Sequence, residues 1–349
     1  MSIVKVAQLA GCSTATVSRV LNRRPGVSDD AAARVHEAAR QLNYRPPTLR
    51  RGPQPKTPRP VSFGHVAFLL FGTRANPLAA PTAAAVVDAV ETALRRQVTS
   101  MTLARIQDED RLPSIVEQGR VDGLILHGLP PRPELARRLQ KLPAVWVMTP
   151  RAANGYWGDR VAPDNAAVGR MAADYLMARG HDRIALLGVS GGHLGFAQRC
   201  AAFEETAAAA GVTCHLIDAG GPGGDDEDFA KQRRGIDALI DAFCRLTERP
   251  TGLFVPRGRA MPMVFEALRL RGLEPGRDLT VIACDNDPAL AGLTPPIATI
   301  DVRPDLVGRS AVDQLMRRIE TPEAFSRASV LIEPTLLEPG RARDSMGGR

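Results

Sequence analysis

Ser190 has the sequence setting of a catalytic nucleophile. It lies within residues 188–192, which fit the pattern G-x-S-x-G and fall between a predicted strand and a predicted helix. A hydrolase of that type also needs an acid and then a histidine further along the chain. The histidines that follow are His193 and His215, and the only acids between Ser190 and His215 are two glutamates. A full triad in so short a segment does not fit that fold. Hydrolysis by Ser190 is therefore a distant alternative, and we expect no enzyme.

Cysteine usage and chain ends limit the class of protein further. The five cysteines are odd in number and show no C-x-x-C spacing, which argues against a zinc ribbon or a secreted disulfide framework. We expect no metal and no cofactor. No leader-like segment opens the chain, and the longest clear apolar run, residues 66–71, is far too short to span a membrane. These features predict a cytoplasmic protein without membrane contact.

Positive charge is concentrated at the start of the chain. The 349 residues are 44% hydrophobic and 24% charged, as in soluble globular proteins, and the length predicts two or three domains. Residues 1–60 hold eleven Lys or Arg and three acids, a net charge of +8, whereas the remaining 34 basic and 35 acidic residues sum to −1. This distribution indicates a polyanion-binding module joined to a body that binds something else.

Residues 3–21 have the pattern of two short helices joined by a tight turn. Val6, Leu9 and Ala10 form one predicted apolar face, and Gly11 ends the first helix. Ser13 is placed to cap a second helix, whose apolar residues are Val17, Val20 and Leu21. A third helix is predicted from residue 28 to about residue 43, with Val35, Ala38, Ala39 and Leu42 inward. This is a helix-turn-helix arrangement, whose second helix enters the DNA major groove.

The same stretch resembles the lactose-repressor (LacI) family of bacterial regulators almost without interruption. The matching residues are Val6-Ala7-x-Leu9-Ala10-Gly11-Cys12-Ser13, Thr16-Val17-Ser18-Arg19-Val20-Leu21-Asn22, Val27-Ser28 and Leu42-Asn43-Tyr44-Arg45-Pro46. The resemblance implies that Thr14, Ala15 and Arg19 read bases. It also implies that phosphates are held by Ser13, Thr16, Asn22 and Tyr44. Arg23 adds backbone affinity or belongs to a solvated basic loop.

The linker departs from this family. At the position where relatives carry a leucine that wedges into the minor groove, this sequence has Pro53, and Gly52-Pro53 ends any helix early. The sequence therefore predicts no leucine wedge. One hypothesis is that Arg50 and Arg51 follow the minor groove electrostatically, and the alternative is a flexible tether without groove contact.

The rest of the chain alternates short apolar runs with amphipathic helical segments. This pattern predicts an α/β body of parallel sheets with helices on both faces, in two units of five or six strands. The family resemblance extends here through residues 121–126, 142–145, 180–185, 278–282 and 333–336. It implies a periplasmic-binding-protein type I body, with two lobes, three crossovers and an effector in the cleft between them.

The expected domains follow from these features. Residues 1–46 form the helix-turn-helix domain and residues 47–60 a Pro-rich basic hinge. Residues 61–162 and 303–325 form the first lobe, 163–302 and 326–340 the second, and 341–349 a tail.

Five residues are expected at the effector site from the resemblance: Asn76, Asp164, Arg199, Arg257 and Asp285. Arg257 is a departure, because the family has Asn-Asp where this sequence has Arg257-Gly258-Arg259. Arginine offers only donors, whereas asparagine offers a donor and an acceptor. Arg199 and Arg257 in one cleft would suit a sugar acid or a sugar phosphate. Alternatively, Arg257 pairs with Asp285 or points to solvent, and the ligand is neutral or absent.

Together these features predict a transcription regulator, most simply a repressor, that binds a pseudo-palindromic operator as a homodimer. An effector in the cleft, either a sugar or a sugar-derived acid or phosphate, would modulate operator affinity. In the alternative, the same DNA-binding head is joined to a cleft that answers to a protein partner or to no ligand. We expect a bacterial cytoplasmic location, on the nucleoid when DNA is bound.

Overall fold

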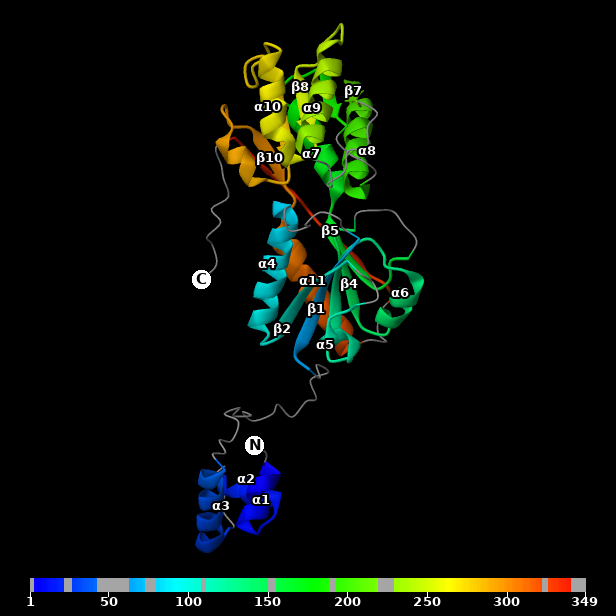
Figure 1. Cartoon of the computed structure of the whole chain (residues 1–349). Helices are drawn as coiled ribbons and strands as arrows, with labels where there is room; N and C mark the ends of the chain where they lie inside the picture. The colour runs from blue at the N-terminus through cyan, green and yellow to red at the C-terminus, as the bar shows by residue number, and fades with distance from the viewer. Residues whose placement is uncertain are drawn as a thin grey trace. The chain divides into compact units, whose positions relative to one another are not determined.

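The computed structural model describes residues 3–21, 27–42, 63–72, 80–107, 111–149, 155–188, 193–218, 229–321 and 326–339 (Figure 1). The chain divides into two compact units, residues 1–58 and 59–349. None of the helices in the described ranges is long and apolar enough to cross a membrane.

The first unit is a three-helix head made of α1 (Ile3–Ala10), α2 (Thr14–Leu21) and α3 (Asp29–Gln41). Gly11 has a φ of +62°, which suits the turn after α1. The Ser13 hydroxyl caps α2 by accepting a hydrogen bond from the Thr16 amide at 3.1 Å, as the sequence predicts. Ser28 caps α3, and Asp29 and Asp30 occupy the first turn of that helix.

The predicted apolar face of α1 is wrong at Leu9. Leu9 is 51% exposed, whereas Val6, Ala7 and Ala10 are buried against Val17 and Val35. The core uses the side of α1 that carries two alanines because small side chains let the three short helices approach closely. Leu9 falls outside that stripe.

The first lobe is a six-stranded parallel sheet in the order β11-β5-β4-β3-β1-β2. Its strands are β1 (His65–Phe71), β2 (Ser100–Ile106), β3 (Gly123–Gly128), β4 (Ala144–Val147), β5 (Asp159–Pro163) and β11 (Ser329–Ile332). The helices α4 (Pro81–Arg96) and α11 (Pro304–Glu320) cover one face, and α5 (Ser114–Glu117) and α6 (Pro133–Leu139) cover the other (Figure 1). Alternate residues of β1 enter the two resulting cores, so the strand reads as a continuous apolar run.

The second lobe repeats this plan with the strand order β12-β10-β9-β8-β6-β7. Its strands are β6 (Arg183–Leu187), β7 (Thr213–Ile217), β8 (Gly252–Val255), β9 (Thr280–Cys284), β10 (Ala298–Asp301) and β12 (Thr335–Leu337). β12 pairs antiparallel to β10, and the other pairs are parallel. The helices α7 (Asn165–Met177) and α8 (Leu194–Ala209) pack on one face, and α9 (Phe229–Cys244) and α10 (Met261–Leu270) pack on the other.

Three short connections join the lobes within the described residues, between β5 and α7, β10 and α11, and β11 and β12. Each leaves the carboxyl end of a strand, so the carboxyl edges of the two sheets adjoin these connections. The predicted lobe boundary is wrong for residues 326–332. They belong to the first lobe because β11 pairs in parallel with β5, and only β12 joins the second sheet.

Gly169 sets the distance between α7 and α8. A Cβ at this position would overlap the backbone oxygen of Arg199 and lie 2.8 Å from the backbone nitrogen of Phe203. Only glycine therefore lets the two helices approach as closely as they do. This close packing sets the position of α8, which carries Arg199, relative to α7.

Candidate functional site

The second helix of the head presents the residues expected to read bases. Thr14, Ala15 and Arg19 are exposed on α2, whereas Val17 and Val20 are buried in the head core. Arg19 has no ion-pair partner among the described residues. Its guanidinium fork is therefore available to an external acceptor pair such as the O6 and N7 atoms of guanine.

The residues expected to hold phosphates are partly described. Ser13 and Thr16 lie at the amino end of α2, with their hydroxyl oxygens 2.9 Å apart. Free backbone N–H groups and the helix dipole favour a phosphate at such a position. Asn22, Arg23, Tyr44, Arg50 and Arg51 lie outside the described residues. Pro53 also lies outside the described residues, so the predicted absence of a leucine wedge stays a prediction.

Arg199 joins four segments at the carboxyl edge of the second sheet. From α8 its Nε donates to Asn165 Oδ1 at 2.9 Å, and its Nη1 donates to the backbone oxygen of Pro256 at 2.6 Å. Its Nη2 forms an ion pair with Asp285 Oδ1 at 2.9 Å. The Arg199 side chain is 5% exposed. The structure thus brings the expected site residues Arg199 and Asp285 together. They form an ion pair with each other.

The electrostatic surroundings of Arg199 favour its charged form. Burial lowers the pKa of Arg199, but the neighbouring carboxylate of Asp285 outweighs burial and leaves that pKa above its ordinary value. Asp285 and Asn286 follow β9 with φ values of +79° and +46°, a conformation that Asp and Asn tolerate better than other side chains. The interpretation that Arg199 and Arg257 both offer their charge to an anion needs correction, because Asp285 neutralises Arg199.

Arg257 lies beside this pair and shares an aromatic ring with it. It is 9% exposed, and its guanidinium carbon lies 5.1 Å from the centroid of the Phe196 ring. The guanidinium carbon of Arg199 lies 5.1 Å from the same centroid. His193, which caps α8, contacts the Phe196 ring at 4.8 Å between centroids. Asp285 pairs with Arg199, and the pairing of Arg257 with Asp285 stays a prediction.

Sequence reasoning missed Phe196 and Asn165 as site residues. Phe196 precedes Arg199 by three residues on α8, a spacing that places both on one side of a helix and could have indicated it. Asn165 follows Asp164, whose Oδ1 caps α7 by accepting from the Ala167 amide at 2.8 Å. Asp164 lies in the lobe connection between β5 and α7. Asn76 and Ser190 lie outside the described residues. No group of three or more metal-ligating side chains occurs within the described ranges.

A helix-turn-helix head and a body of two parallel-sheet lobes joined by three crossovers define a DNA-binding regulator with a periplasmic-binding-protein-like body. Residues 2–47 match the family of bacterial regulatory proteins, lacI family. Residues 76–240 match the periplasmic binding proteins and sugar binding domain of the LacI family, and residues 173–341 match a periplasmic binding protein-like domain. The chain belongs to the LacI family, and it is a DNA-binding transcriptional regulator.

Individual relatives agree with this assignment over nearly the whole chain. The ribose operon repressor of Escherichia coli K12 is 29% identical over 344 residues, which cover 97% of this chain and 98% of that relative. The transcriptional regulator CelR in complex with cellobiose is 23% identical over 97% of this chain and 99% of its own, with a TM-score of 0.64. The lac repressor dimer bound to operator and the anti-inducer ONPF is 20% identical over 97% of this chain and 98% of its own, with a TM-score of 0.66. The last two likenesses show a shared fold.

Proposed function

We propose that this protein is a repressor that binds a pseudo-palindromic operator as a homodimer and is modulated by a sugar-like effector between its lobes. The observation that carries the proposal is α2, a capped helix that exposes Thr14, Ala15 and Arg19 and buries its opposite side. Such a helix has the size and polarity to enter a major groove. The protein would act in the bacterial cytoplasm, on the nucleoid when bound.

The dimer follows from symmetry. One head reads one half-site, so recognition of two symmetric half-sites requires two heads. The similar lac repressor structure is a dimer on its operator, which supports the same arrangement here. Selection of binding sequences from random duplex DNA tests this: an inverted repeat protected on both halves is the expected product, and a single unrepeated site would contradict the dimer.

The proposed effector site is the carboxyl edge of the second sheet, where Arg199 and Arg257 face the Phe196 ring. Asp285 pairs there with Arg199, and Asp164 caps α7. Parallel sheets bind ligands beyond the carboxyl ends of their strands. Asp164 and Asp285 would accept hydrogen bonds from hydroxyl groups. Because Asp285 neutralises Arg199, recognition of a carboxylate or phosphate on the effector would fall to Arg257.

Replacing Arg257 by asparagine tests the anionic group. We expect a sugar acid or sugar phosphate to bind the Arg257→Asn variant about 10- to 100-fold more weakly, since a charge-assisted hydrogen-bond pair is lost. Isothermal titration with ribose, cellobiose, their acids and their phosphates measures the change. Arg249→Asn, at an exposed arginine before β8, is the matched control. Tight binding of a neutral sugar, unchanged in Arg257→Asn, would refute the anionic effector.

The alternative, in which the cleft responds to a protein partner or to no ligand, predicts a different experimental result. In a thermal-shift screen of small metabolites, the melting temperature of the full chain would then stay constant throughout. A shift with any sugar or sugar derivative that Asp285→Asn abolishes would instead support the effector site.

A further inference from the structure

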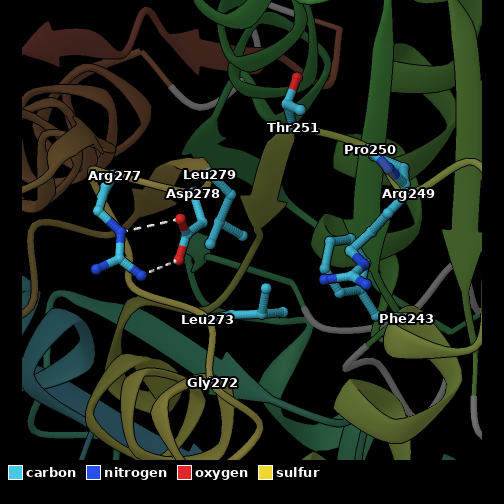
Figure 2. Close-up of a pocket in the computed structure, with 9 residues that line it drawn as sticks. All are labelled: Phe243, Arg249, Pro250, Thr251, Gly272, Leu273, Arg277, Asp278 and Leu279. Carbon is cyan, nitrogen blue, oxygen red and sulfur yellow. Dashed lines mark hydrogen bonds and ion pairs between the residues drawn. The ribbon is translucent and has the colours of Figure 1, made fainter.

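Two cavities lie away from the proposed effector site, at the amino edges of the two sheets. The one in the second lobe, of about 380 Å³, is lined by the starts of β8 and β9 and by Phe243 (Figure 2). At one side Arg277 forms two hydrogen bonds to Asp278, at 3.0 and 2.8 Å. With the Glu274 amide, these bonds hold the pKa of Asp278 at about 2. The two charges cancel each other, which leaves Arg249 as the cation of this cavity.

The cavity in the first lobe, of about 450 Å³, has a different charge. Three cations line it, and none of the described residues that line it is acidic. Four segments supply the lining: the segment that leads into β4, the two residues before β5, the last turn of α11 and the segment before β11. The lining residues are Gln140, Lys141, Leu142, Pro143, Ala144, Trp157, Gly158, Arg318 and Arg327.

The three cations of this first-lobe cavity differ in how they are held. Arg318 is bound to the buried carboxylate of Asp159, at 2.6 and 3.0 Å. Arg327 uses Nη1 to donate to the Tyr156 backbone oxygen at 3.2 Å. Lys141 is exposed and has no partner among the described residues. Lys141 and Arg327 therefore keep donors that no other described residue accepts.

Part of the wall of the first-lobe cavity is apolar. Trp157 is 5% exposed and lines the cavity together with Leu142 and Pro143. Trp146 supports the Trp157 ring from behind in an edge-to-face contact, with centroids 5.2 Å apart and an interplanar angle of 89°. A rigid indole wall next to two available cations is the arrangement that binds planar anions.

We propose that this first-lobe cavity is a second ligand site, separate from the effector site, for a small organic anion with a flat apolar body. The anion would lie between Lys141 and Arg327, and its apolar part would lie against Trp157, Leu142 and Pro143. Such a ligand contacts α11 and the segments before β5 and β11. These segments lie at the amino edge of the first sheet, opposite the edge from which the lobe connections leave.

The two tryptophans of the chain make the proposal directly testable. Trp157 lines this cavity and Trp146 packs against Trp157, so the tryptophan emission of the full-length protein comes from this one part of the first lobe. The probe is 8-anilinonaphthalene-1-sulfonate, a flat apolar anion that accepts energy from tryptophan. We expect saturable quenching with about one probe per chain. The uncharged analogue N-phenyl-1-naphthylamine should bind about tenfold more weakly.

Two exposed-residue variants locate the probe without disturbing the core. Lys141→Gln and Arg327→Gln should each raise the dissociation constant of the probe about three- to tenfold, and the double variant more. Arg249→Gln, at the cavity of the second lobe, should leave it unchanged. Equal binding of the neutral analogue, or a dissociation constant unaffected in the double variant, would overturn the proposal. The outcome does not depend on DNA or on the proposed effector.

Discussion

Replacement of Arg19 by alanine is expected to lower affinity for the selected operator by about 10- to 100-fold. The reason is that a bidentate contact from arginine to guanine discriminates by about 1–3 kcal/mol. Arg19 is exposed on α2 and unpaired among the described residues, so its loss removes a DNA contact without removing a contact that holds the head together. Fluorescence anisotropy at fixed salt concentration measures the loss.

Two controls distinguish a base contact of Arg19 from non-specific attraction to phosphates: binding to random-sequence DNA and a variant of a second arginine in the head. Binding of Arg19→Ala to random duplex should fall much less, because that binding depends on phosphate contacts and total charge. Arg34→Ala is the control within the same head, since Arg34 pairs with Asp30 on the surface of α3. An equal loss on operator and random DNA would show that Arg19 contacts phosphate and not a base.

Replacement of Asp159 by asparagine is expected to lower the free energy of unfolding by about 3 kcal/mol. Asp159 is fully buried and accepts hydrogen bonds from Arg318, from Gln314 at 2.9 Å and from the Ala328 amide at 2.9 Å. It thus ties β5, α11 and the segment before β11 together. Removing its charge takes the buried carboxylate away from the half-buried guanidinium of Arg318, and breaking such a pair is costly in a protein interior. Urea unfolding at neutral pH measures the change.

The dependence of stability on acid pH gives a second measure of the interactions of Asp159. Burial raises the pKa of Asp159, but the hydrogen bonds from Arg318, Ala328 and Gln314 outweigh burial and hold it below the ordinary 3.8. A lowered pKa in the folded state means that the stabilisation is present above pH 3.8 and is lost as the pH falls through the folded value. Asp159→Asn should lack that part of the acid dependence.

Asp305→Asn is the surface control for this comparison. Asp305 pairs with Arg309 one turn along α11, with both side chains more than 40% exposed, and such pairs contribute about 0–1 kcal/mol. If Asp159→Asn costs no more than Asp305→Asn, or keeps the acid dependence of the parent protein, then Asp159 does not hold the three segments together.

The elements that sequence reasoning found are those with strong local signals. The cap at Ser13, the turn at Gly11 and the apolar run of β1 each appear where the pattern predicts them. The strands β5, β10, β11 and β12 have weak local signals, because none of them contains more than three consecutive apolar residues. They are stable because neighbouring strands pair with them, and a neighbouring strand is not part of the local sequence.

The candidate sites divide in the same way. Thr14, Ala15 and Arg19 could be assigned from the sequence because a single helix positions all three. The partner of Arg199 could not, because Asn165, Pro256 and Asp285 come from separate segments of the second lobe. Phe196 could not be assigned to the site from the sequence, because the loop after β8 brings Arg257 to its ring only in the folded lobe.

By itself, the sequence determined the family, the helix-turn-helix head with its positive charge, and a two-lobed α/β body. Those properties depend on spacing within one element or on composition, which local chain chemistry sets. Only the tertiary structure decided that Asp285 neutralises Arg199, that Asp159 joins the segments leading to the lobe connections, and that Lys141, Arg327 and Trp157 share a cavity. The physical reason is that the groups surrounding a charged side chain determine whether it is paired or available to a ligand. In this body those groups come from strands and helices far apart in the chain.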